Sequence, residues 1–234
     1  MMNAMNRRSM LKSSALVVGG TVLGMSSNTT QAACPASNGK GESSMLKKYP
    51  NEFYYDKDGK FLVEKAKQAY YEMMEYYKYP IPDVLRSAEF WALDFELGDF
   101  ANCGMGGIFW VNVEKYRYFG HEIYLLPGQM IPEHRHIETT YPCKMESWQI
   151  RYGSAFNWSE GEPTVPAIAE IPASQKATSH CQHCELLKVG DVRHLEVPES
   201  WHFLMGGPEG AIVTEYARYH DGAGVKFSNT KAVM

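Results

Sequence analysis

The chain has 234 residues, of which 44% are hydrophobic and 21% are charged, and its formal net charge is −4. This composition is typical of a globular protein with a core, and the length favours one domain with a small extension, so fibrous and disordered classes are excluded. Because no stretch forms a basic stripe, nucleic acid is not an expected partner.

Residues 1–33 have the pattern of an export signal. Arg7 and Arg8 precede a short apolar run at 15–23 that is followed by small residues, and the combination resembles a twin-arginine signal. The run is too short for a comfortable membrane anchor. We therefore expect export through the twin-arginine route to the periplasm, with no transmembrane span in the mature chain. Removal of this segment would leave 20 basic and 27 acidic residues.

The first cysteine gives the N-terminus a second interpretation. Cys34 follows Thr-Gln-Ala-Ala, a position similar to that of a lipidated cysteine, although Gln31 stands where a branched apolar residue is usual. A lipid anchor at Cys34 and a free N-terminus both stay open. Residues 34–48 are rich in Ser, Gly, Lys and Pro, so we expect an exposed linker.

Residues 49–100 are expected to form an N-terminal helical extension. Within it, residues 60–79 place apolar side chains at helical spacing, and Pro80 and Pro82 stop the pattern. The repeating positions are Leu62, Ala66, Ala69, Tyr70, Met73 and Tyr77. This stripe predicts one amphipathic helix whose apolar face serves packing.

From residue 101 to residue 234 the chain consists of short apolar or alternating runs separated by Gly, Pro and Asn. This texture predicts an all-β domain, mostly antiparallel, in a sandwich or barrel. The segment GMGG at 104–107 lacks the spacing of a dinucleotide fingerprint and is expected to form a turn.

Two alternating pairs of polar residues lie on neighbouring runs. Successive side chains of a strand point to opposite faces, so His134 and His136 share a face, and so do Lys144 and Glu146. Another imidazole is available at His202, in a segment that we expect to be a tight loop. Imidazoles and a carboxylate suit a hard-to-borderline metal ion. The sequence therefore predicts a metal site formed by these three histidines and Glu146.

Glu215 is a further carboxylate with an unusual setting. Alternation along 211–217 puts Glu215 on the same face as Ala211 and Val213, which indicates an interior position. A carboxylate among apolar neighbours is costly unless it is paired, so we expect it to have a chemical role.

Other histidines and cysteines are left outside this site. We interpret His121, His194 and His220 as hydrogen-bonded core residues. The segment His180–Cys184 has ligand-like spacing without a second Cys-x-x-Cys, so a local disulfide and a metal-binding loop both stay open.

Together these residues resemble the cupin superfamily and, more specifically, the cupin-type D-lyxose isomerases. The resemblance is carried by YLLPGQMIPEHRH, KME at 144–146, VPESWHFLMGG and GAIVTEYARYHD, with ALDFELGDF upstream. It extends over about residues 60–230 and implies a cupin jelly-roll barrel with a short N-terminal helical extension. After residue 146 this chain has SWQIRYG where that family usually has a Gly-rich stretch.

The resemblance also implies an activity. It implies a metal-dependent aldose–ketose isomerase of the D-lyxose to D-xylulose type, acting through an enediolate on a small sugar, and a homodimer. The four predicted ligands would hold a divalent metal, typically Mn²⁺, and Zn²⁺, Fe²⁺ or Co²⁺ also suit such donors. Lys144 and Glu215 would act on the substrate, and which of them is the base stays open.

Two alternatives belong to other function classes. A cupin dioxygenase could use the same ligands for iron or copper. A non-catalytic sugar-binding cupin would keep the ligands without needing an acid and a base. Lys144 and Glu215 favour proton transfer over both alternatives.

Overall fold

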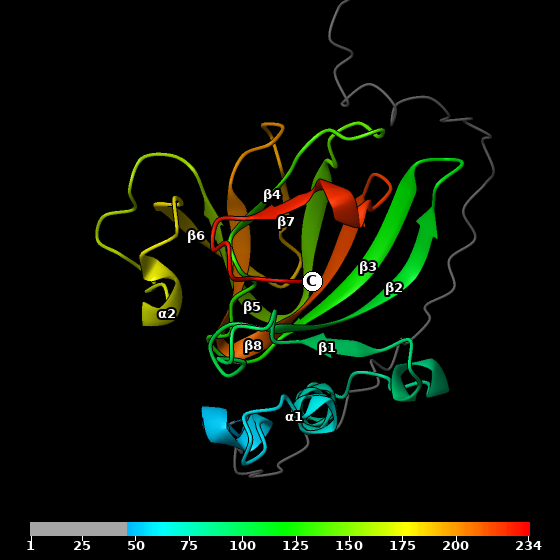
Figure 1. The fold of residues 1–234 in the computed structure, drawn as a ribbon, viewed down its shortest axis with the longest axis vertical. Helices are drawn as coiled ribbons and strands as arrows, with labels where there is room; N and C mark the ends of the chain where they lie inside the picture. Colours follow the sequence, from blue (N-terminus) through cyan, green and yellow to red (C-terminus); the bar gives the residue numbers. More distant parts are fainter. Residues whose placement is uncertain (1–45) are drawn as a thin grey trace, which may run out of the picture. The chain divides into compact units, whose positions relative to one another are not determined.

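The computed structural model describes residues 46–234, drawn as the coloured ribbon in Figure 1. The predicted signal at 1–33, Cys34 and the linker up to residue 45 lie outside the described residues. Residues 46–50 precede the first helix and have no regular secondary structure. Among the described helices, none combines the length and the apolar character that a membrane crossing requires.

The amphipathic helix predicted for residues 60–79 is confirmed as α1 (Val63–Tyr76), which is slightly shorter at both ends. It lies between two short 3-10 helices, η1 (Asn51–Tyr54) and η2 (Asp83–Arg86). The buried face of α1 consists of Ala66, Ala69, Tyr70, Met73 and Met74. As expected from the spacing, this face packs into an apolar core with aromatic residues of the sheet and of the flanking segments.

The described part of the chain also contains nine strands. They are β1 (Trp91–Leu93), β2 (Met105–Val113), β3 (Tyr118–Leu125), β4 (His134–His136), β5 (Glu146–Ser159), β6 (His183–Lys188), β7 (Val192–His194), β8 (His202–Ala217) and β9 (Val225–Phe227). A short helix, α2 (Ala173–Lys176), and a 3-10 turn, η3 (Gly222–Gly224), interrupt the connections.

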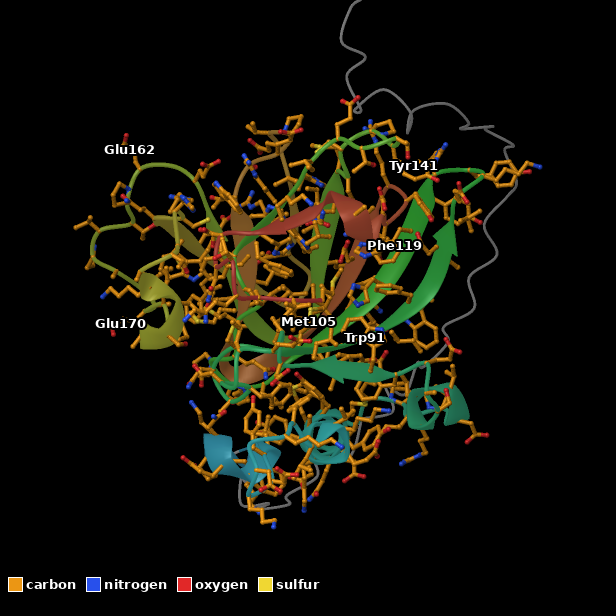
Figure 2. All side chains as sticks on the ribbon, in the orientation of Figure 1. Trp91, Met105, Phe119, Tyr141, Glu162 and Glu170 are labelled. Carbon is orange, nitrogen blue, oxygen red and sulfur yellow. The ribbon has the colours of Figure 1, made fainter. Side chains whose placement is uncertain are left out.

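The strands form one antiparallel curled sheet, which confirms the predicted all-β class (Figure 1). The order runs β1-β2-β3-β8, and β5 pairs with the other edge of β8. Strands β6 and β7 both pair with β5, while the short β4–β9 pair joins the start of β8. The long β5–β6 connection carries the exposed side chains of Glu162 and Glu170 outward (Figure 2).

Strands β2 and β3 separate two apolar cores, because alternate side chains belong to opposite layers. Tyr124 packs in the core around α1, whereas its neighbour Ile123 packs in the core inside the curled sheet. The same alternation applies to Gly106 and Gly107. The turn expected at 104–107 is therefore wrong, since β2 begins at Met105 and both glycines lie within the strand.

Strand β1 lies within residues 49–100, which the sequence assigned to a helical extension. Its three residues pair with β2 from Trp91 opposite Gly107 to Leu93 opposite Met105. Trp91 and Met105 are labelled where these two strands meet in Figure 2. The boundary at residue 100 stays a prediction.

Candidate active site

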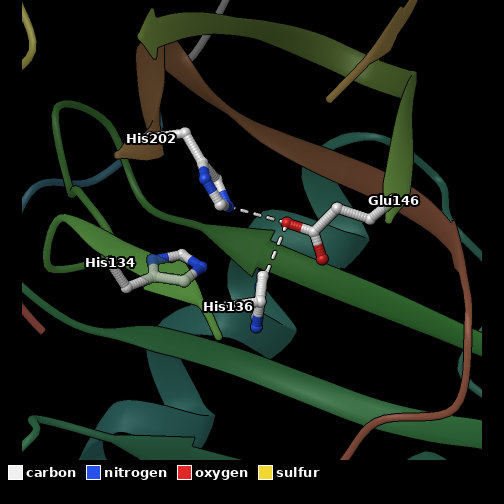
Figure 3. A group of neighbouring side chains, drawn as sticks. All are labelled: His134, His136, Glu146 and His202. Carbon is white, nitrogen blue, oxygen red and sulfur yellow. Dashed lines mark hydrogen bonds and ion pairs between the residues drawn. The ribbon is translucent and has the colours of Figure 1, made fainter. Parts of the chain in front are cut away.

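Four polar side chains from three strands meet inside the curled sheet (Figure 3). His134 and His136 come from β4, Glu146 is the first residue of β5, and His202 is the first residue of β8. Each offers one ligand atom, and these atoms all lie within 4.8 Å of one another. The sequence predicted this set, but the tight loop expected around His202 is wrong, because that residue begins a long strand paired with β4 and β5.

Backbone contacts orient two of the three imidazoles. Nδ1 of His134 lies 2.9 Å from the carbonyl oxygen of Pro132, and Nδ1 of His202 lies 2.9 Å from that of Ser200. A carbonyl oxygen can only accept a hydrogen bond, so each Nδ1 carries a proton. In the neutral ring this leaves Nε2 unprotonated and directed at the group, as in histidines that ligate metals.

Burial favours this neutral form. It lowers the pKa of His134 well below its usual range, and the neighbouring histidines reinforce the effect. Burial also lowers the pKa of His136, although Glu146 opposes the shift. Neutral imidazole is the form that binds a metal ion.

The contacts of the Glu146 oxygen Oε1 suit a bound metal cation. Its Oε1 lies 2.8 Å from Nε2 of His202 and 3.4 Å from Nε2 of His136, a contact marked in Figure 3. In a neutral His202 ring with its proton on Nδ1, Nε2 and the carboxylate oxygen are both acceptors. Nε2 of His136 has no hydrogen-bond partner within the described chain. Three imidazole nitrogens and a carboxylate that face one another in this way fit a divalent cation.

Next to this group, Lys144 connects two buried carboxylates. Its Nζ lies 2.6 Å from Oε2 of Glu146 and also bonds Oε1 of Glu215. Burial works against the ammonium form, but the two carboxylates raise the pKa of Lys144 above its usual value. Burial likewise opposes ionisation of Glu146, yet Lys144 and His136 hold the pKa of that carboxyl well below its usual range.

The structure places Lys144 just before β5 and not within a strand, but on the same side as Glu146, as predicted. Glu215 faces the interior from β8 and is 4% exposed, which agrees with the alternation in its segment. Lys144, Glu146 and Glu215 line one cavity together with the three histidines of the group.

Two histidines that the sequence assigned to the core also line this cavity. His121 is buried, and its Nδ1 lies 3.1 Å from Oε2 of Glu215. Burial lowers the pKa of His220 to about 3, and its Nδ1 has no partner among the described residues. His194 is exposed and bonds Ser147, so the core position expected for it is wrong. The sequence carries no signal for His121, because its place directly opposite Glu215 comes from the β3–β8 register of the fold.

The segment His180–Cys184 has a structural role beside the group. The Glu133 carboxylate accepts hydrogen bonds from the backbone N–H groups of His180, at 2.7 Å, and Cys181, at 2.8 Å. This ties the segment to the residue that precedes His134. Cys181 and Cys184 are buried free thiols whose pKa values burial raises, so this structure contains no disulfide there.

Two sequence relatives of this chain are named as isomerases of D-lyxose. No family model matches the chain. A D-lyxose/D-mannose isomerase of Thermosediminibacter oceani is 36% identical over 129 residues, which is 55% of this chain and 70% of that protein. A D-lyxose ketol-isomerase of a Thermofilum species is 31% identical over 159 residues, covering 68% and 86% respectively.

A solved structure supports the fold. The L-ribose isomerase of Cellulomonas parahominis, determined with L-psicose, superimposes with a TM-score of 0.55 at 14% identity. The superposition covers 76% of this chain and 95% of that one. At this identity the likeness bears on the fold alone.

Proposed function

This chain belongs to the D-lyxose isomerase family and is an aldose–ketose isomerase, and from that premise we propose that it interconverts D-lyxose and D-xylulose. The observation that carries the proposal is the buried row of charged side chains Glu146, Lys144 and Glu215 beside three imidazoles. Such an arrangement offers both a metal site and a pair of groups that can move a proton.

The four-residue group would hold the metal ion. We propose Mn²⁺, which suits oxygen and imidazole donors, and a bound divalent ion would polarise the C1 and C2 oxygens of an open-chain sugar. Support comes from Nε2 of His202 and Oε1 of Glu146, which lie 2.8 Å apart in a group whose four ligand atoms all lie within 4.8 Å of one another.

The proton transfer falls to Glu215 and Lys144. Glu215 takes the proton from C2 of the aldose and returns it to C1, so one C–H bond breaks and another forms. The proton on O2 moves to O1 as the carbonyl moves from C1 to C2, and no oxidant or reductant is needed. Lys144 donates hydrogen bonds to carboxylates on both sides, so it acts as a donor toward the substrate oxygens and Glu215 acts as the base.

The sugar and metal assignments are tested with a panel of pentoses and hexoses. The purified protein is stripped with a chelator and then given Mn²⁺, Zn²⁺, Fe²⁺ or Co²⁺, and the ketose is measured by NMR. We expect conversion of D-lyxose only after metal is restored, with Mn²⁺ most effective. Undiminished conversion by the stripped protein would refute the metal assignment, and failure to convert any sugar after loading would refute the function.

We also propose a homodimer that buries an exposed apolar row on the outer face of the sheet. The strand register aligns Val111 with Gly120 and Gly120 with Tyr216, and Tyr118 follows on the same face. Val111, Tyr118 and Tyr216 are 41%, 49% and 49% exposed. Light scattering is expected to give twice the chain mass, and Val111→Glu is expected to give the monomer. A monomeric wild type would contradict the proposal.

Export is the last part of the proposal. We propose that the chain reaches the periplasm through the twin-arginine route, because Arg7 and Arg8 precede an apolar run. Fractionation of cells that make the full chain is expected to find it outside the cytoplasm, and Arg7→Lys with Arg8→Lys should retain it inside. The mass of the exported form distinguishes a lipidated Cys34 from a free one. Export of the double variant at the wild-type level would contradict the route.

A further inference from the structure

His121 stands outside the metal group but directly against the proposed base. It lies on β3 opposite Glu215 on β8, is 3% exposed, and lines the same cavity. We propose that His121 is a positioning residue that holds the Glu215 carboxylate in the orientation needed for proton transfer. This inference rests on the proposed isomerase function and adds a residue to it.

The Glu215 carboxylate is held from two sides. His121 Nδ1 lies 3.1 Å from its Oε2, while Lys144 Nζ bonds its Oε1. The two contacts come from separate elements, one from β3 and one from the segment before β5. Rotation of the carboxylate would break one contact or the other, so the pair fixes the plane of the carboxylate.

The imidazole of His121 is itself fixed by packing. The ring centroids of Trp91, Phe109 and Phe119 lie 5.4, 4.9 and 5.6 Å from that of His121. A Cβ atom at position 107 would overlap both Nε2 of His121 and the Trp91 ring, so only glycine leaves room there. The packing of β1, β2 and β3 around the His121 ring therefore favours one ring orientation.

Hydrogen bonding also defines the protonation of the ring. Nε2 of His121 is buried and has no partner among the described residues. A proton on Nε2 would be a buried donor without an acceptor, which is unfavourable. The ring proton therefore resides on Nδ1, where it is donated to Glu215. His121 thus donates from Nδ1 to the carboxylate and orients it, and it is not part of the metal group.

Three substitutions separate this role from simple packing. In His121→Asn the amide N–H occupies roughly the place of Nδ1, in His121→Gln it lies near the place of Nε2, and in His121→Phe no donor remains. Misplacement of a catalytic group by about 1 Å costs on the order of 10²-fold in rate, so we expect kcat to fall by that factor in the Gln and Phe variants. The Asn variant should recover most of kcat, and KM and metal content should stay close to wild type in all three.

A kinetic isotope effect gives a further test, because it should not change if His121 only fills space in the core. With sugar deuterated at C2, the isotope effect on kcat should be larger in His121→Gln and His121→Phe than in wild type. The reason is that proton transfer becomes slower than the other steps in these variants. The exposed His194 provides a matched control, and His194→Asn and His194→Gln should behave as wild type.

The outcomes distinguish this inference from the proposed function. A wild type that converts no sugar would refute the function itself. With an active wild type, the role of His121 is overturned if the Gln and Phe variants keep wild-type kcat, or if Asn is as slow as Gln. It is also overturned if kcat falls only in proportion to lost metal or lowered unfolding temperature.

Discussion

The two faces of strands β2 and β3 differ in what they bury. Toward α1 the neighbours are mainly apolar or aromatic, with Tyr70 and Met73 fully buried against the sheet. Toward the cavity β3 contributes His121, which lies beside Lys144 and Glu215, and all three are also buried. Adjacent residues of one strand therefore contribute to two different environments.

This difference separates stability from chemistry. Burial of apolar surface stabilises by roughly 25 cal/mol per Å². Buried ion pairs roughly offset their own desolvation and are strongly destabilising when one partner is removed. The layer with α1 therefore mainly contributes stability, while the layer inside the sheet combines an apolar core with charges that serve the reaction and must remain paired.

The largest effect is expected from removing the charge that connects the two carboxylates. Lys144→Met leaves Glu146 and Glu215 buried without their shared partner, which should destabilise the metal-free protein by about 3–5 kcal/mol. Denaturant unfolding in chelator measures it. Adding Glu215→Leu should restore part of the loss, because an apolar pair needs no partner. If Lys144→Met leaves the unfolding free energy unchanged, the cavity layer is not under the proposed electrostatic constraint.

The helix layer should show the opposite behaviour. Met73→Ala removes a fully buried side chain from the core around α1 and should cost about 2–5 kcal/mol of stability. Because Met73 does not line the cavity, kcat and KM should stay at wild-type values at a temperature where the variant is folded. Glu75→Ala, at an exposed position of the same helix, is the matched control. A fall in kcat of folded Met73→Ala would show that the two layers are coupled.

The smallest effects come from the adjacent glycines of β2 and compare the two faces most closely. A methyl group at position 106 would meet the Tyr70 ring, and one at position 107 would meet His121 and Trp91. Gly106→Ala should lower stability by about 1–3 kcal/mol with little change in kcat. Gly107→Ala should lower kcat by about 10–100-fold through the displaced His121. If Gly106→Ala and Gly107→Ala changed stability and kcat in the same way, the proposed difference between the two faces of β2 would be contradicted.

The sequence alone is enough to predict which way side chains point within a single strand. Alternation placed His134 with His136 and turned Glu215 inward, since these properties depend on neighbours within one strand. The role of His121 could not be seen in this way. It depends on β3 pairing with β8 in a register that brings together residues 94 positions apart. The start of β8 at His202 likewise depends on its pairing with β4 and β5.

The most direct test of the account compares wild type and Glu215→Gln at equal metal occupancy. Both proteins are stripped, loaded with Mn²⁺, analysed for bound metal, and given D-lyxose while D-xylulose is followed by NMR. We predict equal metal content and a kcat about 10²–10⁴-fold lower in Glu215→Gln, because the general base is lost. Equal rates of conversion by the two loaded proteins would contradict the assignment of Glu215 as the base of this isomerase.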